Sequence, residues 1–107
     1  MIKMTLLIAR KPGTTVDQFK EYWTTKHLEA IQSVPETSRY SRRYRQQLNT
    51  YVGPDHTNAA PFDGIPEAWF DNLEDAMALV TSEGWSNVIK KDDLNFLDVT
   101  KTQMMLS

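Results

Sequence analysis

The stretch Phe19-Lys20-Glu21-Tyr22-Trp23-Thr24-Thr25-Lys26-His27 decides how this chain is organised. Phe19, Trp23 and His27 stand four residues apart, so on a helix of about 3.6 residues per turn they share one face. Two large aromatic rings on that face are followed by an imidazole, whose unperturbed pKa lies near neutrality. The pattern predicts a helix whose buried face carries an acid–base candidate. The alternative is a core histidine that only donates to a backbone carbonyl.

Strand and helix signals continue outward from this helix. Residues 2–9 form an apolar strand, and a Lys-Pro-Gly turn separates it from a Thr15–Gln18 capping box. Alternation from Arg39 to Tyr51 predicts a polar edge strand, and residues 64–70 predict a central one. An Asp71–Glu74 capping box begins the next helix, residues 85–91 form a short extra helix, and a last strand lies within residues 96–106. The order βαββαβ predicts an α+β ferredoxin-like sandwich with a four-stranded antiparallel sheet.

Composition narrows the class of protein. The 107 residues predict a single domain over 1–107, and a net charge of −2 with scattered basic residues does not suggest nucleic-acid binding. The absence of cysteine excludes disulfides and thiolate chemistry. The longest apolar run, Leu6–Ala9, is too short to span a membrane, and no signal segment precedes it, so we expect a cytoplasmic protein. Neither a metal-ligand spacing nor a phosphate-binding glycine loop is present, so we expect no metal and no cofactor.

Tyrosine and glutamate side chains on the predicted strands are the further catalytic candidates. Tyr40 and Tyr44 share one strand face, where a phenol can donate to an enolate oxygen while His27 moves a carbon-bound proton. The alternative is that both phenols pack between the sheet and a partner. Glu67 lies on a strand expected to be central, where a carboxylate either orients His27 or acts as a second acid–base group. Its alternative is an ion pair with Arg10, Arg42 or Arg43.

The remaining candidates are expected to contact a small-molecule substrate in a cavity between helix and sheet. Asp63 stands at the start of the third strand, where it either faces the cavity mouth or caps the loop. His56 lies in a loop that either closes over the substrate or leaves the imidazole in solvent. The full set of expected substrate contacts is Phe19, Trp23, Tyr44, His56, Asp63 and Trp69.

Three motifs in this order resemble the EthD family of the dimeric α/β-barrel superfamily. They are F-x-x-Y-W-x-x-x-H at residues 19–27, Asp63-Gly64-Ile65-Pro66-Glu67-Ala68-Trp69-Phe70, and Asp92-Asp93-Leu94-Asn95-Phe96-Leu97-Asp98. The resemblance implies a homodimer in which two ferredoxin-like subunits pack through their open sheet faces, each enclosing a small-molecule cavity. Relatives are similar to methylmuconolactone isomerases and to polyketide-pathway decarboxylases, dehydratases and cyclases, none of which needs a cofactor. In the isomerases a helix histidine and a strand tyrosine line the pocket, which by motif correspond to His27 and Tyr40.

Three functions follow as expectations. The first is a cofactor-independent lyase or isomerase acting on an aromatic polyketide-like or lactone substrate, with His27 as general base and then acid and Tyr40 donating to the oxyanion. The second is a cofactor-free monooxygenase on an anthrone-type substrate. The third is a non-catalytic small-molecule-binding accessory protein of an oxidative degradation pathway.

Overall fold

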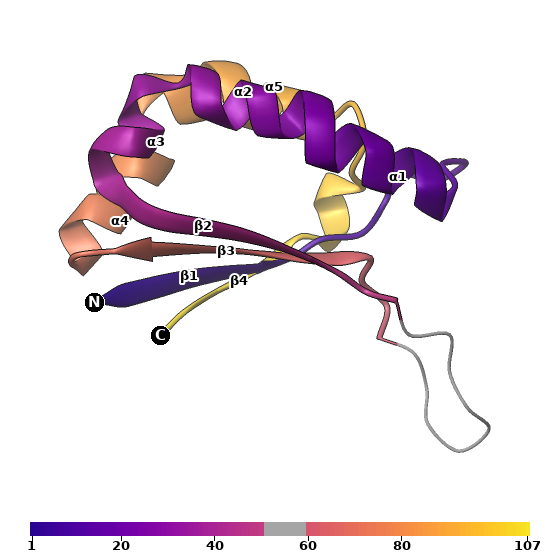
Figure 1. The fold of residues 1–107 in the computed structure, drawn as a ribbon, viewed down its shortest axis with the longest axis horizontal. Coiled ribbons are helices and arrows are strands. Elements are labelled where there is room, and N and C mark those ends of the chain that lie inside the picture. The colour runs from indigo at the N-terminus through magenta and orange to yellow at the C-terminus, as the bar shows by residue number, and fades with distance from the viewer. Residues whose placement is uncertain (51–59) are drawn as a thin grey trace.

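A four-stranded antiparallel sheet organises the molecule. The computed structural model describes residues 1–50 and 60–107. Strands β1 (Ile2–Leu7), β2 (Ser41–Leu48), β3 (Gly64–Phe70) and β4 (Gln103–Leu106) lie in the order β2-β3-β1-β4, and each neighbouring pair is antiparallel. The helices cover one face of this sheet and leave the other face open (Figure 1). The ferredoxin-like α+β prediction is therefore confirmed, with β1 and β3 central and β2 at an edge.

The first helical arm is continuous but not uniform. It consists of α1 (Val16–Tyr22), a π-helical turn η1 (Trp23–His27) and α2 (Leu28–Ser33). The predicted capping box is present, because the side chains of Thr15 and Gln18 each accept a hydrogen bond from the other's backbone N–H. The second arm contains α4 (Leu73–Val80), the π-helical η2 (Trp85–Ile89), α5 (Lys90–Asp93) and the 3-10 turn η3 (Val99–Lys101). Here the N-cap is Asn72 rather than the predicted Asp71, because the Asn72 Oδ1 accepts from the Asp75 N–H at 2.9 Å.

Residues 35–40 correct the predicted start of the second strand. They form a short helix, α3 (Pro35–Tyr40), so Tyr40 ends a helix and β2 begins only at Ser41. Proline at the first helical position has its φ already set for a helix. A tertiary bond then holds the turn, because the Glu36 carboxylate accepts from the Gly84 N–H at 3.0 Å. A register irregularity near Ser41 and Arg43 further breaks the alternation expected from Tyr40 onward.

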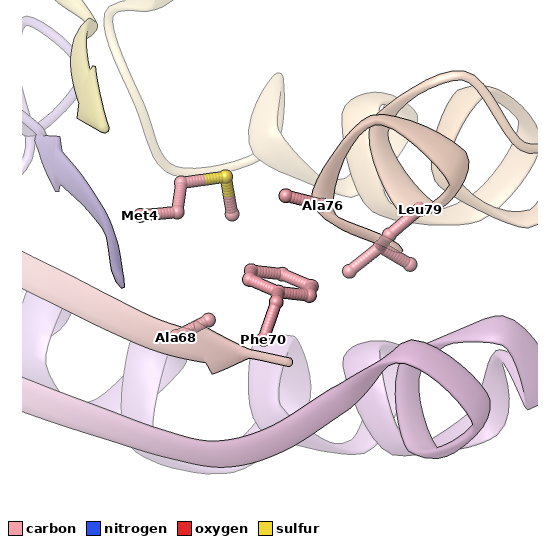
Figure 2. Packing of buried hydrophobic residues seen from close by; sticks show 5 residues of the cluster. All are labelled: Met4, Ala68, Phe70, Ala76 and Leu79. Atoms are coloured by element: carbon pink, nitrogen blue, oxygen red, sulfur yellow. The ribbon is translucent and has the colours of Figure 1, made fainter. Parts of the chain in front are cut away.

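Buried side chains fill the space between sheet and helices. Met4 of β1, Ala68 and Phe70 of β3, and Ala76 and Leu79 of α4 form one buried cluster (Figure 2). A second cluster joins β1 to the first arm and the C-terminal segment, through Ile8, Phe19, Trp23, Phe96 and Leu97. Successive side chains alternate across a strand, so Ala68 and Phe70 lie on the inner face of β3, and Glu67 and Trp69, which alternate with them, lie on the open side. No helix within residues 1–50 and 60–107 is long and apolar enough to cross a membrane.

Candidate functional site

The imidazole of His27 lies at the end of the π-helical turn, enclosed by aromatic rings. Only 5% of the residue is exposed. Its ring centroid lies 4.7 Å from that of Phe96, which in turn stacks on Phe19 at 5.7 Å. π-helical turns are rare and occur often at functional sites, because they shift the side chains that follow. The Trp23 carbonyl at the start of this turn accepts from Gln46 Nε2 at 3.0 Å, which ties the turn to β2.

A carboxylate fixes one nitrogen of this ring. His27 Nδ1 lies 2.7 Å from Asp92 Oδ2. The other oxygen, Oδ1, accepts from the Tyr22 hydroxyl at 2.6 Å and from Asn95 Nδ2 at 3.1 Å. Burial acts to raise the pKa of Asp92, but these hydrogen bonds outweigh it and hold the pKa below its usual range. An ionised carboxylate can only accept, so Nδ1 carries the proton and Nε2 keeps its lone pair.

A second carboxyl group faces that lone pair. Asp93 Oδ1 lies 3.5 Å from His27 Nε2. Burial, and then the charge of Asp92, raises the pKa of Asp93 to about 7. Burial also lowers the pKa of His27, with the Asp92 contact acting in the opposite direction. Near neutral pH the site therefore combines a neutral imidazole with a carboxyl group that can hold a proton.

Both groups border a cavity of about 70 Å³ between the sheet and the helices. Its wall is mainly apolar, with side chains such as Ile8, Trp23 and Leu97. Tyr44 of β2 adds a phenol that accepts from Gln46 Nε2 at 3.2 Å, and burial raises the pKa of Tyr44 to about 12. Thr37 of α3 adds a hydroxyl oxygen, Oγ1, which is the one buried side-chain polar atom without a hydrogen-bond partner in the described residues. The cavity can therefore hold an apolar molecule that carries a few oxygen atoms.

The structure brings four of the predicted site residues to the cavity wall, namely His27, Trp23, Tyr44 and Glu67. Phe19 is fully buried behind them, with its ring centroid 5.4 Å from that of Trp23, so it supports the wall. Predicted His56 falls outside the described residues.

Tyr40 is displaced from its predicted place. It ends α3 instead of opening β2, and its ring packs against the buried cluster that contains Met4 and Phe70. The Arg39 guanidinium carbon lies 6.0 Å from the centroid of this ring. It does not line the cavity. The expected pairing of Tyr40 with His27 is therefore not supported by the geometry.

Glu67 and Trp69 correct the prediction in another way, because both side chains belong to the open face of β3. The Glu67 carboxylate forms an ion pair with Lys3 Nζ at 3.0 Å. An ion pair was the alternative expected for Glu67, but its partner is this lysine and not one of the predicted arginines. The Arg43 guanidinium lies 4.8 Å from the centroid of the Trp69 ring. Trp69 does not border the cavity, whereas Glu67 does, with its carboxylate paired with Lys3 rather than with His27.

Asp63 acts as a tether between chain segments. Its carboxylate accepts from the Arg10 backbone N–H at 2.8 Å and from the guanidinium of the same residue. This agrees with the capping alternative, in which the side chain holds the loop ahead of β3. Asp63 does not border the cavity next to His27.

Sequence reasoning missed the two aspartates that matter most to His27. Asp92 lies 65 residues further along the chain, so no local spacing connects it with the imidazole. The Asp92-Asp93 pair inside the third motif was visible in sequence but carried no assigned role. Within residues 1–50 and 60–107 there is no group of three or more histidine, cysteine or acidic side chains placed to hold a metal ion.

Solved structures share this fold at low sequence identity. An EthD family protein from Bacillus halodurans has a TM-score of 0.72 and 18% identity, over 100% of this chain and 96% of its own. A dimeric ferredoxin-like protein from Bacteroides fragilis has a TM-score of 0.69 and 18% identity, over 99% and 93%. A proposed antibiotic biosynthesis monooxygenase from Nitrosomonas europaea has a TM-score of 0.61 and 12% identity, over 100% and 96%.

At these identities the likenesses concern the fold alone. No curated protein matches the sequence. The family assignment comes instead from the EthD domain, whose sequence pattern matches residues 11–100. That match spans the first helical arm, strands β2 and β3 and both aspartates beside His27, and the chain accordingly belongs to the EthD family.

Proposed function

We propose that this protein is a cofactor-independent lyase or isomerase acting on a compact aromatic, polyketide-like or lactone carbonyl compound. One observation carries the proposal: a buried histidine whose Nδ1 proton is fixed by Asp92 presents the Nε2 lone pair beside an apolar cavity. A general base needs this combination of an unprotonated nitrogen and an oriented ring. His27 is neutral near pH 7 because burial lowers its pKa.

The chemistry requires a substrate that stabilises its own carbanion. His27 Nε2 removes a proton from the carbon next to a carbonyl group, and the electron pair moves onto the carbonyl oxygen as an enolate. Return of the proton at another carbon gives an isomer, and departure of a β-hydroxyl gives a dehydrated product. In decarboxylation His27 first takes the proton of the substrate's carboxylic acid, and loss of carbon dioxide leaves the electron pair of the broken C–C bond as the enolate. Protonated His27 then returns that proton to the carbon.

Cavity size limits the substrate. A volume of about 70 Å³ is below the roughly 300–1,000 Å³ of pockets that hold drug-sized ligands. We therefore infer a compact substrate, or a larger one that enters as the surrounding side chains move apart. The Thr37 hydroxyl, which has no partner among the residues that the structure describes, supports the presence of an oxygen atom on that substrate, because a buried polar group is expected to find a hydrogen-bond partner.

The test is a turnover screen of phenolic polyketide intermediates and unsaturated lactones, read by mass spectrometry. We expect loss of water or carbon dioxide, or an isobaric product, that requires His27 and proceeds without oxygen. His27→Gln keeps a polar side chain of similar length but removes the base. Wild-type turnover that His27→Gln leaves unchanged would falsify the mechanism.

An oxygen-dependent reaction is the second candidate. The fold is shared with the proposed monooxygenase from Nitrosomonas europaea, and a substrate carbanion formed by the same base can react with oxygen. A product heavier by oxygen, formed only in air, would favour this monooxygenase. Ligand binding that quenches tryptophan fluorescence, with no product under either condition, would favour a non-catalytic binding protein.

A homodimer through the open sheet face completes the proposal. Trp69 and Arg43 lie on this face, and Met105 of β4, which is 62% exposed, pairs with Thr5 there. An uncovered sheet face with large side chains favours association with a second copy. The similar ferredoxin-like protein from Bacteroides fragilis is described as dimeric.

A further inference from the structure

The carboxyl group of Asp93 occupies a position that the proposed reaction has not yet used. It borders the same cavity as His27, and its Oδ1 lies 3.5 Å from the ring nitrogen that acts as the base. Its side chain is 25% exposed, against 7% for His27. Asp93 is therefore the more accessible of the two groups.

The charges around this carboxyl group come from several elements. Asp92 is its neighbour in α5, Lys90 lies one turn earlier in the same helix, and the Tyr44 hydroxyl approaches from β2. His27 faces it from the end of η1. Among these groups only the imidazole can exchange a proton with Asp93 near neutral pH, since Asp92 stays ionised and Tyr44 stays protonated.

The number of protons held between His27 Nε2 and the Asp93 carboxyl group determines whether the two groups attract each other. A lone pair on Nε2 and an ionised carboxylate cannot face each other favourably, whereas one proton between them gives a hydrogen-bonding pair. With Nδ1 already donating to Asp92, the pair holds that single proton either on Asp93 or on Nε2. With the proton on Asp93, the site contains a base and an acid at the same cavity wall.

We propose that Asp93 is a second catalytic residue, the acid that protonates the substrate's carbonyl or leaving-group oxygen while His27 Nε2 accepts the carbon-bound proton. This inference rests on the proposed proton-transfer function. The sequence predicted a hydrogen bond from Tyr40 to the substrate oxygen, and here Asp93 acts on that oxygen instead, as a proton donor. In an isomerisation, the C–H electron pair forms the enol double bond and the Asp93 proton goes to the carbonyl oxygen. Protonated His27 then delivers its proton to the new carbon, and the enol proton returns to Asp93.

Elimination of water balances in the same way. His27 takes the C–H proton, the C–O bond breaks with its electron pair, and Asp93 protonates the leaving hydroxyl as water. The site is left with protonated His27 and ionised Asp93, and transfer of one proton from Nε2 to Oδ1 restores the starting state. The substrate class that fits is a carbonyl compound with an acidic C–H bond and an oxygen atom within reach of Asp93.

The first test needs no substrate. Aspartate side-chain carboxyl carbons, labelled with carbon-13, are titrated by NMR in the wild-type protein and in Asp93→Asn. We expect one carboxyl to titrate near neutrality, to be missing in Asp93→Asn, and to move together with the His27 ring signals. An Asp93 carboxyl that titrates at about 4, like an ordinary aspartate, overturns the inference.

The second test uses α-angelica lactone, whose isomerisation moves a proton from the carbon next to the carbonyl group. Wild-type kcat/KM should fall on both sides of neutrality, because the base must be neutral and the acid protonated. Asp93→Asn should lower kcat/KM roughly a hundredfold or more and remove the alkaline limb, since an amide does not titrate. Asp93→Glu should restore part of the rate, and the exposed control Asp71→Asn should match wild type.

The two proposals fail differently. Loss of activity in His27→Gln, together with wild-type rate and an intact alkaline limb in folded Asp93→Asn, overturns the role of Asp93 and leaves the proposed function standing. The proton-transfer function itself is overturned if the wild type neither isomerises the lactone nor exchanges its acidic hydrogen with solvent, or if both variants keep the wild-type rate. Thermal denaturation checks that Asp93→Asn is folded.

Discussion

At the residue scale, the protonation and the tautomer of His27 depend on a chain of hydrogen bonds as well as on burial. Tyr22 and Asn95 donate to Asp92, which in turn holds the imidazole. Helical spacing in the sequence was enough to predict that Trp23 and His27 share a buried face. Spacing could not reveal Asp92, because the contact joins residues 65 positions apart and forms only when α5 packs beside η1.

The first prediction concerns Asp92→Asn. The amide cannot supply a full negative charge, so the pKa of His27 should fall further and its tautomer should no longer be fixed. NMR titration of the ring should show this fall, and kcat should drop by at least about tenfold if His27 is the base. A ring pKa that rises or stays constant in the variant would contradict the assigned role of Asp92.

Asp92→Asn also makes a prediction about stability. The folded-state pKa of Asp92 is depressed, so its contribution is present above the unfolded value near 3.9 and is lost as pH falls through the folded pKa. At neutral pH the variant should unfold about 1–3 kcal/mol more easily, since hydrogen bonds to a charged acceptor are lost. Urea denaturation should show this gap narrowing as the pH falls below the unfolded pKa of about 3.9. A gap of constant size would contradict the linkage.

Replacing Thr37 should leave the free energy of unfolding unchanged or raise it, in contrast to the loss expected for Asp92→Asn. The Thr37 Oγ1 is buried and has no partner among residues 1–50 and 60–107, so Thr37→Val removes a hydroxyl that this part of the chain leaves unsatisfied. We expect the free energy of unfolding to stay level or to rise by up to about 1 kcal/mol. The contrasting variant is Thr81→Val, at an exposed threonine that loses a bond of 2.7 Å to the Met77 carbonyl and should be destabilised instead. Urea denaturation compares the two, and a clear loss of stability in Thr37→Val would mean that its hydroxyl has a partner.

At the element scale, small residues on β3 determine which face the first helical arm covers. A Cβ atom at Gly64 would lie 2.6 Å from Trp23 Cζ3 and 2.8 Å from its Cη2. This explains why the prediction that Trp69 contacts a substrate in the cavity was wrong. The sequence shows which β3 residues share a face, but the face with the large Trp69 resembles the core until Trp23 is known to fill the space above Gly64.

Gly64→Ala tests this packing. The Trp23 ring is almost fully buried and cannot move aside, so overpacking should lower the free energy of unfolding by about 1–3 kcal/mol. Trp23→Phe removes the ring atoms that meet the new methyl group. In the double variant, Gly64→Ala should therefore be less destabilising than it is alone, as measured by a double-mutant cycle in urea. Additive effects would contradict direct contact as the cause.

Element boundaries mark the other limit of sequence analysis. The periodicity of residues 16–33 and the alternation in β3 are strong local signals, and both elements were found. Helix α3 was missed because the Glu36 contact that anchors it comes from Gly84, 48 residues away. A shift of the strand start by two residues, from Arg39 to Ser41, was sufficient to move Tyr40 out of the expected site.

At the scale of the whole molecule, the fold separates two tasks between the two faces of one sheet. The inner face and the helices enclose the His27 cavity, and the open face presents Trp69, Arg43 and Met105. If two copies meet through that face, a negative charge placed there should separate them. The same charge on the outer side of the helices should have no such effect.

Met105→Glu and Leu73→Glu provide that comparison. Met105 is 62% exposed on the open face, and Leu73 is 51% exposed at the start of α4 in the helical layer. We expect wild type and Leu73→Glu to have the mass of a dimer in light scattering after size-exclusion chromatography. Met105→Glu should shift toward the monomer because it buries an unpaired carboxylate close to Glu67. A monomeric wild type would reject the dimer, whereas dissociation by Leu73→Glu alone would place the interface on the helices, because only the face that carries the contact can respond to the charge.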